Sequence, residues 1–379
     1  MEIAFVNHTA TVSGGEVSLL EVIPPLLTRG FRITLFCPPG ELAERAARLG
    51  VTVVEVGELR LAFRTTVPAM AAALLSAAQT AARIRRHCAR HGVSVLHANT
   101  VRAALIAMLA RLFGGPRVIA HVRDVLPAGR PAALVRRLLC AGSDLVLANS
   151  RYTARSVRCP RGVTTVYSAV DLRRFAPTGA RAMQADLTLG VLGQVTSWKA
   201  QDDAIRILAL VAREHPRARL VVAGSVRFEA GATLDNQAYM ASLHQLAEDL
   251  GVADHVSFTG HLESPEQLLG ELDMLLVPSI QEPFGRVVVE AMAAGTPAIA
   301  TAEGGPAEII ENGVNGVLLP PRDPARWAAA ILALASDPGR WLKMSDRARE
   351  RSASFSVEAC ADRLAGIYQG LERARPVAS

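Results

Sequence analysis

Short runs of apolar residues alternate with longer segments of helix-like periodicity along most of the chain. In the first half, the runs typical of strands cover 3–7, 32–37, 51–56, 94–99, 117–122, 144–150 and 163–168. In the second half, they cover 187–195, 218–225, 255–262, 274–279, 296–302 and 316–321. Strands that alternate with helices form parallel sheets covered by helices on both faces. The pattern therefore predicts an α/β protein with two Rossmann-like domains, one in each half.

The chain is long enough for two such domains. Its 379 residues exceed one ordinary hydrophobic core, and half of them are apolar. The periodicity lapses over 171–187, where Pro177 and Gly179 interrupt it. We therefore expect an N-terminal domain over 1–175, a C-terminal domain over 176–355 and a terminal helix over 356–379.

The terminal segment has the spacing of an amphipathic helix that begins near Ser356. Its apolar positions are Ala359, Leu364, Ile367 and Leu371.

Charge is distributed unevenly along the chain. From 79 to 174 there are 17 arginines, three aspartates and neither lysine nor glutamate, so this part is strongly basic and the remainder is mildly acidic. One interpretation is that the basic half meets an anionic surface or a phosphorylated acceptor. The other is a general preference for arginine on solvated helix faces.

Other features limit the class of protein. The first residues lack the basic lead and apolar core of a signal peptide, and the most apolar stretch, 67–86, is too short to span a membrane. The five cysteines are scattered, without the spacing of metal or redox pairs. We expect a cytoplasmic protein with buried thiols.

One lysine occupies a turn that suits phosphate binding. The chain has two lysines, Lys199 and Lys343, against 39 arginines. In the stretch "LGVLGQVTSWKAQDDAIRIL", a strand ends at Gly193 and a helix begins near Asp202, with Lys199 between them. A glycine turn lets backbone approach a phosphate, and a lysine there supplies a positive charge. The spacing matches neither a Walker loop nor the G-x-G-x-x-G fingerprint.

Two glutamates flank a predicted helix start in "QEPFGRVVVEAMAAGTPAIA". Glu282 lies in the loop and Glu290 lies about one and a half turns into a helix that ends near Gly295. The amides at the helix start can bind an anion, and each carboxylate can accept from a pair of hydroxyls. A ligand with a pair of hydroxyls on each side of its phosphates is a nucleotide sugar, with the ribose on one side and the hexose on the other. A glycosidase-like acid and base pair stays open, because the spacing does not fix the distance between the carboxylates.

This block, E-P-F-G-x-x-x-x-E-A-M-A-x-G-x-P, resembles the E-x7-E signature of retaining glycosyltransferases of the GT-B fold, family 4. The resemblance extends across nearly the whole chain and includes "GGPAEIIENGVNGVLLPPRDP" in the second half. The matches in the N-terminal half, such as "SGGEVSLLEV", "SVLHANTVRAALIA" and "IAHVRDVLP", are weaker. The resemblance implies two facing Rossmann-like domains, the first for the acceptor and the second for the nucleotide sugar. It also implies that the terminal helix returns to the first domain.

The resemblance implies donor-binding roles in the second domain. Glu290 would hold the ribose hydroxyls and Glu282 those of the transferred sugar. Lys199 would neutralise the diphosphate, together with the amides at the helix start, which belong to Phe284, Gly285 and Arg286.

In the first domain, Gly14 and Gly15 would bring a loop against the phosphates and the acceptor. His121 matches the family's active-site histidine, so the catalytic residues would be His121, Glu282 and Lys199. The acceptor-binding candidates are His97, Asn99 and Asp124.

The chain departs from the family pattern at one phosphate-binding position. Gly193 is followed by Gln194 where arginine is usual, and Lys199 is followed by Ala200 where glycine is usual. Glutamine donates hydrogen bonds but carries no charge. Either Lys199 suffices, or an arginine such as Arg286 or Arg227 substitutes, or the affinity for the donor is reduced.

The expected activity is transfer of a hexose from a nucleoside diphosphate sugar to an acceptor hydroxyl with retention of configuration. The acceptor would be a carbohydrate, a lipid or a small molecule. No cofactor, metal or nucleic acid is expected, and the basic half would allow peripheral contact with an anionic membrane. The alternatives are a nucleotide-sugar epimerase, a phosphorylase and a non-catalytic nucleotide-binding protein. A dehydrogenase is disfavoured because the dinucleotide fingerprint is missing.

Overall fold

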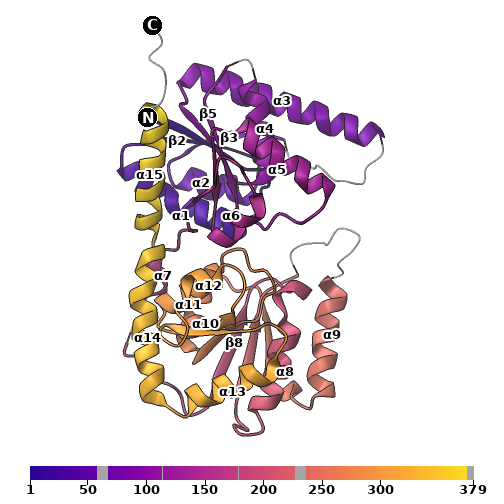
Figure 1. Ribbon diagram of the computed structural model, residues 1–379, viewed down its shortest axis with the longest axis vertical. Coiled ribbons are helices and arrows are strands. Elements are labelled where there is room, and N and C mark those ends of the chain that lie inside the picture. Colours follow the sequence, from indigo (N-terminus) through magenta and orange to yellow (C-terminus); the bar gives the residue numbers. More distant parts are fainter. Residues whose placement is uncertain (58–66, 113, 178, 227–235, 374–379) are drawn as a thin grey trace. The chain divides into compact units, whose positions relative to one another are not determined.

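A computed structural model of the chain describes residues 1–57, 67–112, 114–177, 179–226 and 236–373 (Figure 1). Arg227, one of the candidates for the second phosphate-binding cation, lies outside these residues. The chain forms two compact units: unit 1 is Met1–Ala169 with Val357–Ser379, and unit 2 is Val170–Ser356. The division lies six residues before the expected boundary at 175, because α7 (Leu172–Phe175) packs with helices of unit 2.

Unit 1 is built on a seven-stranded parallel sheet. Its order is β3-β2-β1-β4-β5-β6-β7. The strands are β1 (Glu2–Val6), β2 (Arg32–Cys37), β3 (Thr52–Glu55), β4 (Val95–Ala98), β5 (Arg117–Val122), β6 (Leu145–Ala148) and β7 (Thr164–Thr165). Four of these strands, β1, β2, β4 and β5, are almost entirely buried, as the continuous apolar runs indicate.

Helices cover both faces of this sheet. The helices preceding unit 2 are α1 (Gly14–Thr28), α2 (Glu41–Arg48), α3 (Val67–His91), α4 (Val101–Arg111), α5 (Arg130–Gly142) and α6 (Arg151–Val157). One core cluster joins the sheet to α1 and α2, and another joins it to α3, α4, α5 and α6. Thr100 and Ser150 cap α4 and α6 by accepting hydrogen bonds from backbone amides.

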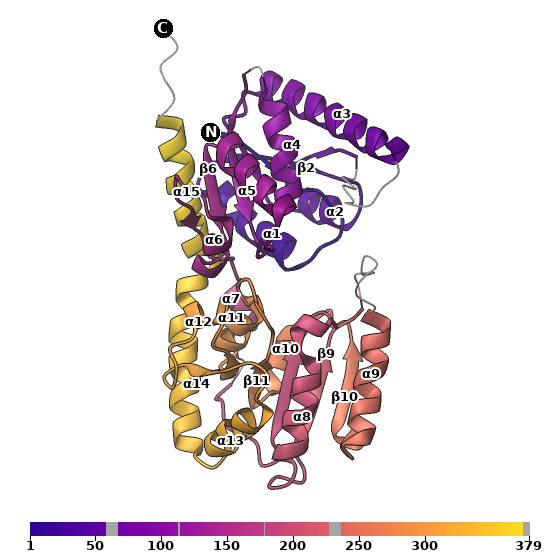
Figure 2. The same cartoon turned by 45° about the vertical axis from the view of Figure 1, so that its right-hand side comes forward.

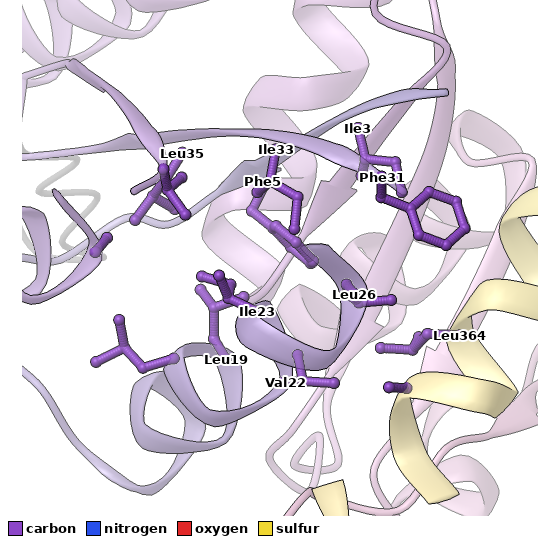
Figure 3. Packing of buried hydrophobic residues seen from close by; sticks show 14 of the residues in the cluster. Ile3, Phe5, Leu19, Val22, Ile23, Leu26, Phe31, Ile33, Leu35 and Leu364 are labelled. Carbon is purple, nitrogen blue, oxygen red and sulfur yellow. The ribbon is translucent and has the colours of Figure 1, made fainter. Parts of the chain in front are cut away.

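The terminal helix, α15 (Val357–Arg373), packs on α1 within unit 1. Its buried face consists of Val357, Ala361, Leu364, Ala365 and Tyr368. Figure 3 shows Leu364 beside Leu26 and Phe31. The expected apolar face was therefore partly wrong. Ala359 is exposed, because the face that meets α1 is centred on Leu364 and Tyr368.

Unit 2 is built on a six-stranded parallel sheet. Its order is β10-β9-β8-β11-β12-β13. The strands are β8 (Thr188–Leu192), β9 (Arg219–Ala223), β10 (Val256–Gly260), β11 (Met274–Val277), β12 (Ala298–Thr301) and β13 (Gly316–Leu319). The two parallel sheets confirm the α/β class with two Rossmann-like domains that the sequence predicts.

The helices of unit 2 surround this second sheet (Figure 2). Besides α7, they are α8 (Gln201–Val211), α9 (Asn236–Asp249), α10 (Pro265–Glu271), α11 (Arg286–Ala293), α12 (Pro306–Ile309), α13 (Pro324–Ala335) and α14 (Pro338–Ser352). The core joins α8, α9 and α13 to the sheet and includes Trp327 and Trp341. Asp323 and Asp337 cap α13 and α14, each of which begins with a proline.

The strand orders define where a ligand binds in each unit. In unit 1 the connections leave in opposite directions from the neighbouring strands β1 and β4, and in unit 2 from β8 and β11. In open α/β sheets, ligands bind beyond the carboxyl ends of the strands at such switch points. The residues that follow these four strands are therefore the first candidates for a functional site.

Candidate active site

The first part of the site in unit 2 is the turn that follows β8. Gly193 has a positive φ of 145°, and the side chain of Lys199 packs over it. Lys199 ends a single 3-10 turn (Ser197–Lys199), and its Nζ lies 4.4 Å from the centre of the Trp198 ring. The sequence places a lysine in this loop, and the fold turns it toward the strand-end glycine.

Lys199 meets the loop that follows β11. Its Nζ lies 2.6 Å from Oε2 of Glu282, and both side chains are mostly buried, with 15% and 9% of their surface exposed. The two loops are also joined through backbone, because the amide of Ile280 donates to the carbonyl of Trp198 at 2.7 Å. Two residues 83 positions apart in sequence thus form one ion pair at the switch point.

The second glutamate lies on the helix that follows. Gly285 is the N-cap of α11, with φ of 92°, and Arg286 is its first residue, as the sequence predicts. The Nη2 of Arg286 lies 3.1 Å from Oε1 of Glu290, and both side chains are largely buried. Each of the two predicted glutamates is therefore paired with a cation.

A glycine pair after β12 holds the Glu282 loop in place. The amide of Gly305 donates to the carbonyl of Glu282 at 2.8 Å. A Cβ on Gly304 would lie 2.5 Å from that carbonyl oxygen, and one on Gly305 would lie 2.3 Å from the Cα of Phe284. Only glycine fits at these positions, so the "GGP" segment shapes the loop that carries Glu282.

Polar contacts hold the turn that contains Gln194 and Ala200, the two departures from the family pattern. The backbone carbonyl of Gln194 accepts a hydrogen bond from buried Gln201 at 2.8 Å. The adjacent Asp202 and Asp203 are both bound by Arg322, at 2.6 and 3.0 Å. Burial raises the pKa of Asp203, an effect that Arg322 opposes.

Among the described residues, no three His, Cys, Asp or Glu side chains are grouped as metal ligands.

In unit 1, Gly14 and Gly15 form the first turn of α1. Ser13 and Glu16 make a capping box at its start, with Glu16 almost fully buried. Asn99, which directly follows β4, donates to Asn7 at 3.1 Å and to the carbonyl of Gly15 at 3.4 Å. The structure thus brings Asn99 and the glycine turn together at the β1 and β4 switch point.

The two predicted histidines lie deeper, in a buried chain of hydrogen bonds. The Nε2 of His97 lies 3.1 Å from Nδ1 of His121, and the Nδ1 of His97 lies 2.6 Å from the hydroxyl of Tyr368. Burial and then the charge of Arg123 lower the pKa of His97 from 6.5 to about 3. The same causes lower the pKa of His121 well below its usual value. His121 is 2% exposed, and its Nε2 makes no hydrogen bond within the described part of the chain.

The residue that sequence reasoning missed is Arg123. It is half-buried and directly follows β5, and its Nε donates to Oδ1 of Asn99 at 2.8 Å. Asp124, the predicted acceptor-binding residue beside it, is exposed. The signal that could have found Arg123 is its position, because it follows β5 as Asn99 follows β4.

A cavity of about 380 Å³ opens beyond Arg123 in unit 1. Segment 125–129 and the helices α5 and α6 line it, with Arg136, Tyr152, Arg155 and Arg158 among its residues. The Arg136 guanidinium donates to the carbonyls of Leu126, Pro127 and Ser156 and so fixes the wall of the cavity.

The fold and the unit 2 site define a class. Two parallel Rossmann-like sheets and an E-x7-E pair at a switch point are features of GT-B glycosyltransferases. The family model described as "Glycosyl transferases group 1" matches residues 181–352, and that described as "Glycosyltransferase Family 4" matches residues 12–174.

Individual proteins support the same assignment. D-inositol 3-phosphate glycosyltransferase of Geodermatophilus obscurus is 30% identical over 94% of this chain and 84% of its own length. The protein of the same name from Thermobispora bispora is 34% identical over 61% of this chain. That alignment spans 57% of the relative's length, and the chain likewise spans little more than half of other such relatives. The chain belongs to family 4 of the GT-B glycosyltransferases.

A solved structure shows the same fold over nearly the whole chain. Anabaena Alr3699/HepE, crystallised in complex with UDP, superimposes with a TM-score of 0.82 at 22% identity, covering 98% of this chain and 100% of that one. At this level of identity the likeness establishes the fold.

Proposed function

We propose that the protein is a retaining glycosyltransferase that moves a hexose from a nucleoside diphosphate sugar to an acceptor hydroxyl. The observation that carries this proposal is the 2.6 Å ion pair between Lys199 and Glu282 at the switch point of unit 2. Glu290 and Arg286 form a second pair on the helix that starts from the same loop. The two carboxylates and two cations match the alternation of hydroxyls and phosphates in a nucleotide sugar.

In this proposal, the site stabilises the departing diphosphate. Lys199 and the amides at the start of α11 bind the phosphate oxygens as negative charge develops on them, while Glu282 and Glu290 hold the sugar and the ribose. The bond between the anomeric carbon and the phosphate oxygen breaks, and the acceptor oxygen forms its bond on the same face. The leaving phosphate takes the acceptor's proton. Because protein cations and amides face the diphosphate, we propose that the reaction does not require a metal ion.

The substrates are proposed from the comparisons. The structural neighbour was crystallised with UDP, so we propose a UDP-sugar as donor. The relatives are named for D-inositol 3-phosphate, so we propose a phosphorylated polyol as acceptor. The protein would carry out this reaction in the cytoplasm.

The first test is nucleotide binding by wild type and Lys199→Ala, with Lys343→Ala as a matched control. Lys343 is the other lysine of the chain and lies exposed on α14. UDP should raise the melting temperature of wild type and Lys343→Ala, whereas Lys199→Ala should bind UDP roughly 10- to 100-fold more weakly, because a charge-assisted hydrogen bond is lost. Equal UDP affinity in all three proteins, or no binding by wild type, would contradict the proposed site.

A second test measures the reaction. UDP-glucose and D-inositol 3-phosphate should give a glucoside with the anomeric configuration of the donor, as determined by NMR. Epimerised donor formed without acceptor would indicate an epimerase, and glucose phosphate formed from inorganic phosphate would indicate a phosphorylase. UDP binding without any of these products would favour a non-catalytic nucleotide-binding protein, for which the uncharged Gln194 is the motivating observation.

We also propose that unit 1 contacts an anionic membrane surface. None of the described helices is long and apolar enough to cross a membrane. However, α4 and α5 lie side by side (Figure 2). They expose leucines together with arginines. We call this surface the α4–α5 face; it consists of Leu109, Leu112, Arg130, Leu134, Arg137 and Leu138.

A further inference from the structure

Polar residues follow the strands of unit 1 at the carboxyl edge of the sheet. Each lies one to three residues beyond the last residue of a strand, from β1 and β4 to β7. They are Asn7, Asn99, Arg123, Asn149 and Ser168. All except Arg123 are fully or almost fully buried. The edge therefore combines one half-buried cation with a rigid set of neutral hydrogen-bonding groups.

These groups hold Arg123 from several directions. Its Nε donates to Oδ1 of Asn99 at 2.8 Å, and its Nη1 lies 3.4 Å from the hydroxyl of Ser168. Its own carbonyl accepts from Nδ2 of Asn149 at 2.8 Å. Asn99 in turn donates to Oδ1 of Asn7, and this hydrogen bond fixes the orientation of the Asn99 amide. The orientation of the guanidinium is therefore built into the strand ends.

The glycine turn of α1 is fitted to this arginine. A Cβ on Gly15 would lie 3.0 Å from Cδ of Arg123, so the absence of a side chain lets the arginine lie against the helix start. The carbonyl of Gly15 also accepts from Nδ2 of Asn99 at 3.4 Å. Arg123 is thus placed beside the first turn of α1, at the switch point between β1 and β4.

We propose that Arg123 binds the phosphoryl group of the acceptor, an inference that rests on the proposed function. A guanidinium presents its N–H groups in a planar fork that matches two phosphate oxygens, and a preoriented fork loses little freedom on binding. The amide of Asn99 and the hydroxyl of Ser168, which orient the arginine, are neutral groups. The residue is a substrate-positioning group that selects a phosphorylated acceptor over a neutral one.

The test compares two probes, D-inositol 3-phosphate and unphosphorylated myo-inositol, by calorimetry in the presence of UDP. Wild type should bind the phosphorylated probe more tightly. In Arg123→Met this preference should fall roughly 10- to 100-fold. Arg123→Lys should retain part of the preference, because lysine keeps the positive charge but lacks the planar guanidinium that binds two oxygens at once. The KM for the phosphorylated acceptor should rise by a similar factor, with a smaller change in kcat.

Two control variants separate this role from others. Arg48→Met removes an exposed arginine at the far end of α2 and should change nothing. Arg155→Met removes a cation of the neighbouring cavity. If Arg155→Met loses the preference for the phosphorylated probe and Arg123→Met keeps it, the proposal is overturned and the phosphate site lies in the cavity. A change in UDP affinity in place of acceptor affinity, or no preference by wild type, would also overturn it. Equal UDP affinity in wild type and Lys199→Ala would instead contradict the proposed function, whatever Arg123→Met shows.

Discussion

Individual residues at the strand ends of unit 1 are kept uncharged by their surroundings. His97 contacts both His121 and Tyr368, and the charge of Arg123 acts on both imidazole rings. Burial removes solvent from the rings, and the arginine disfavours a second positive charge. A buried histidine held neutral in this way makes folding sensitive to acid.

We expect His97 to destabilise the protein as the pH falls. Its pKa of about 3 in the folded state lies below the unfolded value of 6.5, so below pH 6.5 the unfolded chain binds a proton that the folded chain does not. The contribution of neutral His97 to the free energy of unfolding is fully present above pH 6.5 and is lost progressively as the pH falls toward 3. At pH 5 the loss is about 2 kcal/mol.

The measurement is urea unfolding at pH 7.5 and pH 5 for wild type and His97→Gln. Glutamine keeps polar groups toward His121 and Tyr368 but does not titrate, so the decrease on acidification should be smaller by about 2 kcal/mol. His244→Gln, an exposed histidine in unit 2, is the control. An identical pH dependence in wild type and His97→Gln would contradict the neutral buried state.

At the scale of elements, the unit 2 site is assembled from three loops that follow β8, β11 and β12. The carbonyl of Trp198 binds the Ile280 amide, and the carbonyl of Glu282 binds the Gly305 amide. Glu282 therefore lies between two neighbouring loops, and its position depends on both. A change in the loop after β12 should therefore displace Glu282 and weaken its ion pair with Lys199.

Gly305→Ala tests this dependence. The added Cβ would lie 2.3 Å from the Cα of Phe284, so the Glu282 loop must move. We expect a loss of stability of about 1–3 kcal/mol and UDP binding at least roughly tenfold weaker. Gly270→Ala is the matched control, because a Cβ there meets no atom within 4 Å. Unchanged UDP affinity in Gly305→Ala would show that the loop after β12 does not position Glu282.

The elements also show what the sequence could predict. Lys199, Glu282 and Glu290 could be predicted as site residues because each lies in a local pattern of strand, turn and helix start. Arg123 was not predicted, because its proposed role depends on Asn99 and Ser168, which the order of the strands brings beside it. The exposed Ala359 was misassigned for a similar reason, since helical spacing does not specify which side of α15 meets α1.

At the scale of the whole molecule, charge and exposed apolar surface coincide in unit 1. The helices α4 and α5 contain five arginines and no acidic residue. Met108 of α4 lies against Gly142 of α5, so the two helices pack closely near their carboxyl ends. Leu134 and Leu138 are 59% and 45% exposed on the same side of α5 as Arg130 and Arg137. Exposed leucines flanked by arginines favour an anionic lipid surface over water or a neutral one.

Co-sedimentation with vesicles tests this proposal. The protein should bind vesicles that contain phosphatidylglycerol and should not bind pure phosphatidylcholine, and added salt should weaken the binding. Leu134→Gln combined with Leu138→Gln should reduce binding at least roughly tenfold, because burying each leucine contributes about 1.5–3 kcal/mol. Leu342→Gln, an exposed leucine on α14 of unit 2, is the control. Equal binding to both lipids would exclude the electrostatic contribution. Binding unchanged by the double substitution would show that Leu134 and Leu138 of the α4–α5 face do not insert into the membrane.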